Sequence, residues 1–332
     1  MRAWLLDDYN GVDKMRLVEV DDPRPAAGEV VLRTLFAGLN PADAFLAVNQ
    51  YPARPTFPHI LGRDGAGEVV ALGEGVTGLK VGDRVGILRG DTGVDRWGTL
   101  AEKVVVEASH LVPIPANWTL EETAGAPLVY LTAWQALTQW TEPATPPAPG
   151  SVLLVTGASG GVGSACVLLG RSLGLTVIGL SRSEQKAKEL IALGADFVFD
   201  PAANNLHKQV LAAIAPRRVD IAVDMVAGPL FNELIGMLGY GGRISVVGRS
   251  GGPVPEFNTA SLFFRRNRVG GVTVSDYSSA EAQQHWKEIV RRLDTLGKKP
   301  VVDGVFDFAV VKKAFARLAE GPMGKVLVRV GK

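Results

Sequence analysis

Hydrophobic and polar positions follow two different patterns along the chain, and the clearer one begins near residue 150. Short apolar runs predict buried strands at Val152–Thr156, Thr176–Leu180, Val219–Asp224 and Gly242–Gly248. Between them, apolar residues recur at helical spacing and predict helices at Glu184–Leu193, Asn205–Ala215 and Pro229–Leu238. This alternation of strands and helices predicts an α/β fold with a parallel, doubly wound sheet.

The residues before about 120 show short strands separated by Gly and Pro turns. The predicted strands are Glu29–Gly38, Gly67–Gly73, Gly82–Ile87 and Ala101–Val106. Such a series is typical of a β-barrel-like domain. The pattern changes at Thr119 and Glu122, which form a capping box, and helical periodicity then continues as far as Trp140.

The last 60 or so residues change the pattern again. A long amphipathic helix is predicted at Ser279–Leu296, and a second helix at Val310–Ala319. Strands are predicted at Val305–Phe308 and Lys325–Val330.

Composition narrows the class of protein. The chain has 332 residues, 47% hydrophobic and 21% charged, as expected for a globular enzyme of two domains. A net charge of +1 gives no basic field for nucleic acid. No apolar run has membrane-spanning length, and acidic residues follow Met1 too early for a secretory signal, so we expect a cytoplasmic enzyme. The one cysteine, Cys166, excludes an intrachain disulfide and a multi-cysteine zinc site.

A Gly-rich turn follows the first apolar strand of the α/β region and opens an amphipathic helix. Ala158, Gly160 and Gly163 stand where a dinucleotide-binding turn needs small residues, for the turn, for the approach of a pyrophosphate and for close packing. The helix N-terminus offers N–H donors and a positive dipole end to the phosphates. The residues expected to line the pyrophosphate are Ser159, Gly160, Gly161 and Val162. The alternative is a Gly-rich turn that binds no ligand.

The end of the second strand indicates which dinucleotide binds. NAD sites carry an acidic residue there, which accepts from the ribose 2′-hydroxyl. Here the position is Ser181, and Arg182 and Lys186 follow as cations able to bind a 2′-phosphate. The sequence therefore predicts NADP(H). The alternative is that Arg182 and Lys186 are solvated charges balanced by Glu184 and Glu189.

Several short motifs, in this order and spacing, carry a family resemblance. They are Ala37–Asp43, Leu61–Gly67, Leu131–Trp134, the Gly-rich turn and Gly324–Val326. The chain resembles the medium-chain dehydrogenase/reductase superfamily, and more narrowly its zinc-independent quinone oxidoreductase branch. The resemblance implies a GroES-like β-barrel catalytic domain (1–120), a Rossmann NADP-binding domain (121–268) and a C-terminal return that completes the catalytic domain (269–332). It also implies an active site in the cleft between domains.

The same resemblance bears on zinc. Zinc-dependent members carry a cysteine where Asn40 stands, a His-Glu pair where Arg63 and Asp64 stand, and another ligand near Leu128. These residues cannot supply the His and Cys ligands that zinc prefers. His59 is the only histidine near the expected site, and we interpret it as a loop residue. We therefore expect no catalytic metal.

Without a metal, hydride transfer needs an electron-poor acceptor, such as a quinone or an α,β-unsaturated carbonyl. The resemblance places Asn40 and Tyr51 as donors to the substrate, Thr132 near the nicotinamide, and Asp43 as the residue that holds the site loop. The competing interpretation is structural, because Asn and Asp beside Pro41 are good turn formers.

Two further cofactor residues are expected. Gly248 ends a strand of the parallel sheet, at the edge where ligands bind in such folds. Relatives imply that Tyr240 approaches the adenosine 2′-phosphate.

The sequence therefore predicts an NADPH-dependent, metal-free reductase of quinones or α,β-unsaturated carbonyls, with a small electrophilic acceptor as its substrate. An enoyl-thioester or 2-alkenal reductase of the same branch, and a non-catalytic NADPH-binding protein, remain open. Relatives imply a homodimer that pairs edge strands near Val269–Ser275. Neither a nucleic-acid nor a membrane partner is expected.

Overall fold

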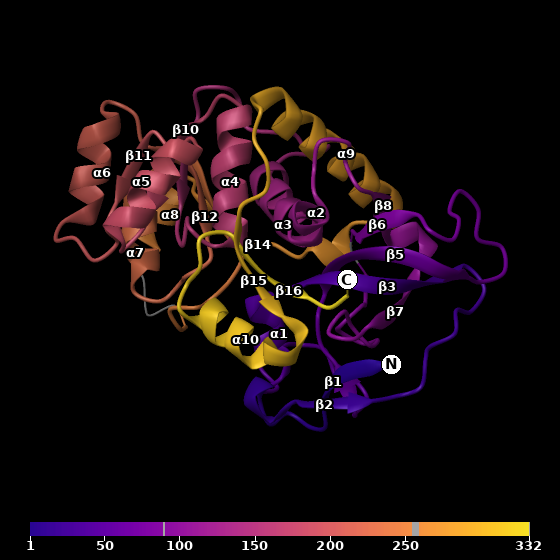
Figure 1. Cartoon of the computed structure of the whole chain (residues 1–332). Coiled ribbons are helices and arrows are strands. Elements are labelled where there is room, and N and C mark those ends of the chain that lie inside the picture. The colour runs from indigo at the N-terminus through magenta and orange to yellow at the C-terminus, as the bar shows by residue number, and fades with distance from the viewer. Residues whose placement is uncertain (89, 254–258, 332) are drawn as a thin grey trace. The chain divides into compact units, whose positions relative to one another are not determined.

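The computed structural model describes residues 1–88, 90–253 and 259–331, and its contacts divide the chain into two compact units (Figure 1). The first unit comprises residues 1–128, 275–290 and 299–332. The second comprises residues 129–274 and 291–298. The contacts thus place the boundaries after residues 128 and 274, where the sequence predicted 120 and 268.

The first unit is built mainly of antiparallel strands. One sheet has the order β2 (Arg16–Glu19), β1 (Arg2–Leu6), β4 (His59–Ile60). The seven-stranded sheet has the order β15 (Val302–Asp307), β16 (Lys325–Arg329), β3 (Glu29–Gly38), β5 (Asp64–Leu72), β6 (Arg84–Ile87), β8 (Leu111–Pro113), and β7 (Lys103–Glu107) also pairs with β3. Helices α1 (Pro41–Leu46), α2 (Leu120–Ala124) and α10 (Val311–Ala319) accompany these sheets.

Strand β16 matters most for the site, because it brings the end of the chain beside the end of β3. The two strands are antiparallel, with Leu327 opposite Gly38, and the Leu39 N–H donates to the Val326 carbonyl over 3.0 Å. Lys325 therefore lies next to Asn40, although the whole nucleotide-binding region separates them in sequence.

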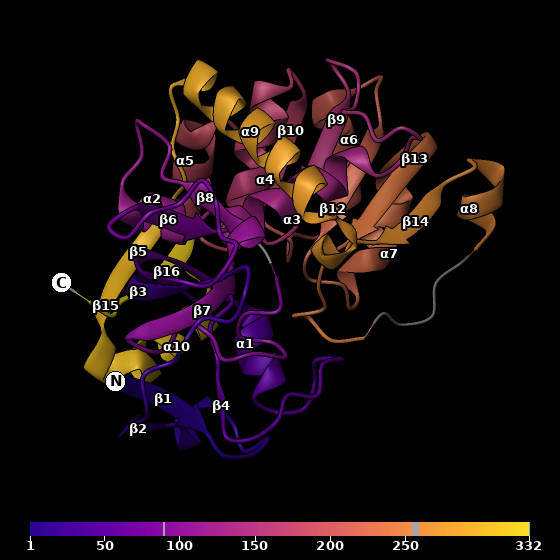
Figure 2. The same ribbon diagram turned by 90° about the vertical axis from the view of Figure 1, so that its right-hand side faces the viewer.

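The second unit is a six-stranded parallel sheet (Figure 2). Its order is β11 (Phe197–Phe199), β10 (Thr176–Leu180), β9 (Val152–Val155), β12 (Val219–Asp224), β13 (Leu238–Val246), β14 (Arg268–Gly271). The helices are α3 (Pro127–Thr138), α4 (Gly161–Ser172), α5 (Glu184–Leu193), α6 (Leu206–Ile214), α7 (Leu230–Met237) and α8 (Ala260–Phe264). Helix α9 (Ser279–Leu296) contributes residues to both units.

Helices cover both faces of this sheet. Helices α6 and α7 pack on the face that carries Leu154, Ile178 and Ala222. Helix α4 packs on the opposite face, where its Gly170 lies against Leu153 and Val177. The doubly wound sheet predicted from the alternating pattern is confirmed.

One predicted helix is interrupted. The periodicity from 120 to 140 suggested continuous helical structure, but α2 ends at Ala124 and α3 begins at Pro127. Gly125 and Pro127, both poor residues for a helix interior, account for the interruption. The predicted capping box is confirmed, because the Glu122 N–H donates to Thr119 Oγ1 and the Thr119 N–H donates to the Glu122 carboxylate. Among the residues the structure describes, no helix is long and apolar enough to span a membrane.

Candidate functional site

A buried polar cluster lies where β16 meets the start of α1. The Lys325 ammonium donates to Asn40 Oδ1 and to Asp64 Oδ2, each over 2.7 Å. Asn40 Nδ2 donates to the same Asp64 oxygen over 2.9 Å. Lys325, Asn40 and Asp64 are 4%, 5% and 1% exposed, so a cation and a carboxylate are paired almost out of reach of solvent. Removing one partner of such a pair leaves the other charge buried and uncompensated.

The amide of Asn40 is fully engaged in this cluster. Besides the bond to Asp64, Nδ2 lies 3.5 Å from the Gly38 carbonyl, and Oδ1 accepts from Lys325. The predicted donation from Asn40 to a substrate oxygen would require these bonds to break. This arrangement favours a structural role for Asn40 and leaves the donor role to another residue.

Asp43 holds the loop that begins α1. Its Oδ2 accepts the backbone N–H of Asn40 over 2.8 Å, and the residue is fully buried. Burial raises the pKa of Asp43 to about 6, although the Asn40 N–H and the nearby cations Arg63 and Lys325 oppose this shift. The Asp43 carboxylate therefore caps its own loop, and its positioning role in the site stays a prediction.

Tyr51 lies in the same unit and is held by an arginine. The Arg63 Nη1 donates to the Tyr51 hydroxyl over 2.7 Å, and the guanidinium carbon lies 5.4 Å from the centre of the ring. Both side chains are half-buried. This contact could not be predicted, because neither the spacing nor the pattern of these residues indicates it.

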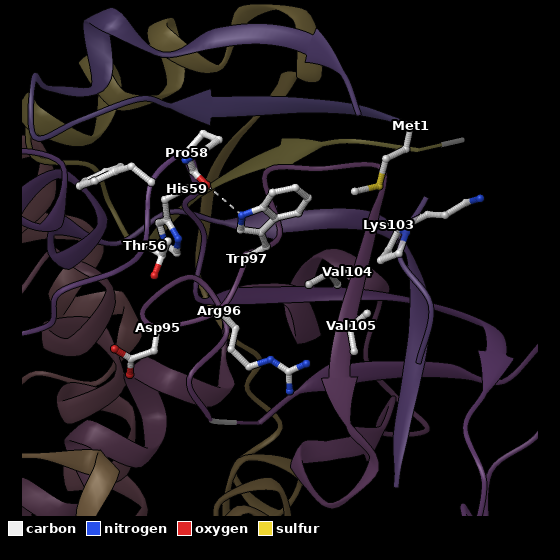
Figure 3. Close-up of a pocket in the computed structure, with 12 residues that line it drawn as sticks. Met1, Thr56, Pro58, His59, Asp95, Arg96, Trp97, Lys103, Val104 and Val105 are labelled. Carbon is white, nitrogen blue, oxygen red and sulfur yellow. Dashed lines mark hydrogen bonds between the residues drawn. The ribbon is translucent and has the colours of Figure 1, made fainter. Parts of the chain in front are cut away.

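A cavity of about 480 Å³ lies elsewhere in the first unit (Figure 3). Trp97, whose indole N–H donates to the Pro58 carbonyl, and the cations Arg96 and Lys103 line it. His59 also lines it and is 1% exposed, and burial lowers its pKa. None of the predicted catalytic residues lines this cavity.

The predicted Gly-rich turn lies between β9 and α4. A Cβ on Gly163 would lie 2.3 Å from the Gly157 carbonyl oxygen and 2.6 Å from the Ala158 Cα, so only glycine allows this packing. A Cβ on Gly160 would meet no atom closer than 3.5 Å, so the second glycine leaves open space. Gly160 is the N-cap of α4 and has no side chain to bond the first N–H groups of the helix. These are the features of a site for a pyrophosphate.

Four other predicted cofactor residues gather at the same edge of the sheet. Ser181, Arg182 and Lys186 follow the carboxyl end of β10, which neighbours β9, and Ser183 caps α5. Gly248 follows the carboxyl end of β13, where its N–H donates to the Asp224 carbonyl over 3.3 Å. In parallel sheets, ligands bind beyond the carboxyl ends of strands.

The ion pairs near Ser181 bear on the alternative that Glu184 and Glu189 balance the charge of Arg182. Glu184 pairs with Lys188 over 3.0 Å, and Glu189 accepts from Gln185 over 2.9 Å. Arg182 is exposed and forms no ion pair with any residue that the structure describes. It is therefore available to an anionic ligand.

Tyr240 does not lie at this edge. It stands near the amino end of β13, close to where Leu238 pairs with Val219, and it is 73% exposed. It lies in the irregular stretch between Leu238 and Arg243, which pair with Val219 and Ile221. The regular strand from Arg243 to Val246, roughly 10 Å at 3.3 Å per residue, separates it from the carboxyl end. The prediction for Tyr240 disagrees with this placement, and we leave it out of the proposed cofactor site. The expectation came from an approximate position in relatives, which did not determine at which end of the strand Tyr240 lies.

Sequence reasoning missed Asp224 and Thr156, which shape the loop after β12. The buried Asp224 Oδ1 accepts from Thr156 Oγ1 over 2.7 Å and from the N–H groups of Val226 and Ala227 over 3.0 Å. Thr156 Oγ1 accepts in turn from the Met225 N–H. The loop lies against the Gly-rich turn, since a Cβ on Gly157 would be 3.6 Å from Val226. The sequence feature that could have identified Asp224 is its position as an acidic residue at the end of a buried strand.

Thr132 lies on α3, in the second unit, whereas Asn40, Asp43 and Tyr51 lie in the first. Its predicted place near the nicotinamide stays a prediction.

Comparisons with known proteins agree with this arrangement. Residues 26–116 match the alcohol dehydrogenase GroES-like domain, and residues 161–295 match the zinc-binding dehydrogenase family. The chain is 30% identical to a structure of an NAD-dependent alcohol dehydrogenase, with a TM-score of 0.91 and 100% of both chains covered. The chain belongs to the medium-chain dehydrogenase/reductase superfamily. It is an oxidoreductase of this family with a GroES-like domain and a Rossmann domain.

Two other relatives bear on its activity. The quinone oxidoreductase of Homo sapiens is 26% identical over 331 residues, which cover 99% of this chain and 97% of the relative. A mycobacterial protein solved in complex with NADPH is 25% identical, with a TM-score of 0.88 and 99% and 100% of the two chains covered. Relatives therefore include an NAD-dependent and an NADPH-binding protein.

The zinc-binding family name raises the question of whether these residues fit a zinc ion. They do not. The cluster offers an amide, Asn40, and one carboxylate, Asp64, and both already bind the Lys325 ammonium. Within the described ranges, no three His, Cys, Asp or Glu side chains are grouped as a metal site would need. Zinc would have to displace a bonded cation and would gain no sulfur or imidazole ligand.

Proposed function

We propose that the protein is an NADPH-dependent, metal-free reductase that transfers hydride to quinones or α,β-unsaturated carbonyls. The observation that carries this proposal is the Lys325 ammonium, which is bonded to Asn40 and Asp64 over 2.7 Å. The family resemblance implies that zinc-dependent members carry a cysteine at the position of Asn40 and a His-Glu pair at the positions of Arg63 and Asp64. A protein cation held there supports chemistry without a Lewis acid. Such chemistry suits acceptors that are already electron-poor.

The cofactor site fits a dinucleotide with a 2′-phosphate. The open space at Gly160 and the N-terminus of α4 suit a pyrophosphate. Ser181 places no carboxylate beside the ribose, and the exposed Arg182 offers a fork of donors to a phosphate. When bound, the reduced nicotinamide supplies the hydride.

The side chains of the first unit have separate tasks in this proposal. Tyr51 supplies the proton that balances the hydride, through a hydroxyl that Arg63 holds by donating to its oxygen. Asp43 and Lys325 hold the Asn40 loop rigid. The alcohol oxidation of zinc enzymes is not expected, because no group of this cluster would lower the pKa of an alcohol as zinc does.

We also propose a homodimer formed through the edge of the second unit's sheet. Strand β14 is the last strand of that sheet (Figure 2). Its Val269 is 43% exposed. Phe263 and Phe264, just before it, are 65% and 73% exposed. An edge strand next to exposed aromatic side chains is a favourable surface for pairing with a second copy. Light scattering that finds a monomer at assay concentration would contradict this part.

The test is NADPH consumption with a 1,4-quinone and a 2-alkenal side by side, with NADH as the control cofactor. Turnover with NADPH supports a reductase, and the ratio of kcat/KM for the two acceptors assigns the acceptor class. Saturable NADPH binding without turnover of either acceptor contradicts the proposal and favours a non-catalytic NADPH-binding protein.

A further inference from the structure

The contact between Arg63 and Tyr51 suggests how the proton is delivered. Arg63 lies in the segment between β4 and β5, directly before Asp64 of the buried cluster. Its Nη1 reaches the Tyr51 hydroxyl oxygen over 2.7 Å, the length of a strong hydrogen bond from a charged donor. The arginine therefore donates to the oxygen of the hydroxyl and does not engage the hydrogen of that hydroxyl.

The direction of this hydrogen bond decides what Tyr51 can do. A guanidinium has only donors, so the tyrosine oxygen must be the acceptor in this contact. No described residue accepts the hydroxyl hydrogen of Tyr51 in return, and the half-buried side chain keeps this hydrogen available to a bound molecule. A tyrosine whose oxygen is held by a cation is arranged to lose its proton, since the resulting phenolate would keep the charged donor.

Arg63 lies close enough to the buried cluster for its charge to act on Asp43. Asp43, which is fully buried, attracts the Arg63 charge, and this attraction opposes the effect of burial on the Asp43 pKa. Arg63 Nε is buried and has no partner among the described residues, so the guanidinium has no competing carboxylate bond at that atom. Among the described residues, the hydrogen bond that Arg63 makes is therefore the one to the Tyr51 hydroxyl.

We infer that Arg63 is a positioning residue that makes Tyr51 the proton donor of the reaction. This inference rests on the proposed function. For an enone, hydride adds to the β-carbon, and the electron pair of the C=C bond moves toward the carbonyl to form an enolate. The Tyr51 O–H bond then breaks and its proton goes to the enolate oxygen. The electron pair stays on the tyrosine oxygen as a phenolate that accepts from Arg63, and solvent later returns the proton.

A double-mutant cycle tests this inference. Tyr51→Phe removes the hydroxyl, Arg63→Met removes the cation at similar length, and the double variant carries both. Tyr51→Phe should lower kcat about 100-fold or more, as removal of a general acid does. Arg63→Met should lower kcat by roughly 10- to 100-fold, with KM nearly unchanged, and should have no further effect in the double variant.

Arg54 provides a matched control. Its Nη1 donates to the backbone carbonyl of Tyr51 over 3.1 Å, so it is also a cation beside Tyr51 but does not contact the hydroxyl. Arg54→Met should leave kcat within about twofold of the wild type, as expected for an exposed side chain away from the reacting group. Arg63→Lys keeps a charge and should restore part of the activity that Arg63→Met loses.

Each outcome has a defined meaning. Additive losses in the double variant, or equal losses for Arg54→Met and Arg63→Met, would overturn the role of Arg63 while the reductase activity stands. A wild-type enzyme without turnover would overturn the proposed function, and the role of Arg63 with it. Thermal melting and NADPH affinity that match the wild type in every variant exclude a general loss of structure as the cause.

Discussion

The candidate cofactor site and the candidate catalytic region are formed by different parts of the residues: the first by backbone, the second by side chains. In the second unit, the candidate cofactor site at the carboxyl ends of the strands is formed by backbone and by glycines. A Cβ at Gly163 would collide with backbone, and a Cβ at Gly160 would occupy open space. In the first unit, the candidate catalytic region is a network of charged side chains around Lys325 and Asp64. A site formed by backbone tolerates substitution of the surrounding surface side chains but not of its glycines. A site made of buried charges depends on each partner.

The largest effect is expected from breaking the buried ion pair. Lys325→Met leaves Asp64 buried without its cation, and we expect the free energy of unfolding to fall by about 3–5 kcal/mol. Chemical denaturation measures this change. The control is Lys188→Met, which breaks the exposed pair with Glu184 and should change stability by less than about 0.5 kcal/mol. Equal effects of the two substitutions would show that the Lys325 pair is not buried in solution.

A second prediction uses the pH dependence of the same region. The folded pKa of Asp43, about 6, lies above the ordinary value of 3.8, so the folded protein binds the proton more tightly. The stability that this protonation contributes is present below about pH 4 and is lost as the pH rises to about 6. The expected change is on the order of 3 kcal/mol.

The measurement is the free energy of unfolding of wild type and Asp43→Asn between pH 3.5 and 7, and only the wild type should show this loss. Asp7→Asn is the control with the opposite sign. Hydrogen bonding by Arg16 holds the pKa of Asp7 low, so that carboxylate contributes stability that is lost as the pH falls. Parallel pH curves for wild type and Asp43→Asn would refute the assignment.

The third prediction separates two neighbouring glycines of the candidate cofactor site. Gly163→Ala forces a methyl group against the Gly157 carbonyl and should lower stability by roughly 1–3 kcal/mol. Gly160→Ala fits the protein and should leave the melting temperature unchanged, but should weaken NADPH binding because the methyl group enters the space meant for the pyrophosphate. Unchanged NADPH affinity in Gly160→Ala would mean that the phosphates bind elsewhere.

The smallest expected effect concerns the choice between NADPH and NADH. Ser181→Asp combined with Arg182→Gln places a carboxylate where a 2′-phosphate would lie and removes its cation. The preference for NADPH should fall about tenfold to 100-fold, the value of one or two charge-assisted hydrogen bonds. Lys188→Gln removes a cation from the same helix that already pairs with Glu184, and should leave the preference unchanged. An unchanged ratio in the Ser181→Asp, Arg182→Gln variant would show that the 2′-phosphate site lies elsewhere.

The same contrast explains which features could be predicted from the sequence. Strands β3, β10 and β12 and helix α9 have the bounds that the hydrophobic pattern predicts, because local periodicity determines them. The Gly-rich turn was also predictable, since its function requires small residues at a fixed spacing.

The side-chain network was not predictable in this way. Lys325 reaches Asn40 through the pairing of β16 with β3, which joins the two ends of the chain. The contact of Arg63 with Tyr51 depends on how two loops fold back on each other. The expectation for Tyr240 has another origin: it came from relatives, although the predicted strand Gly242–Gly248 already placed this residue before the amino end.

In this oxidoreductase we propose that a lysine, and not a metal ion, occupies the polar cluster. The most direct test is to measure zinc content and NADPH-dependent reductase activity in the same chelator-washed protein. We predict substoichiometric zinc with undiminished kcat. Stoichiometric zinc whose removal abolishes activity, and whose return restores it, would contradict the account.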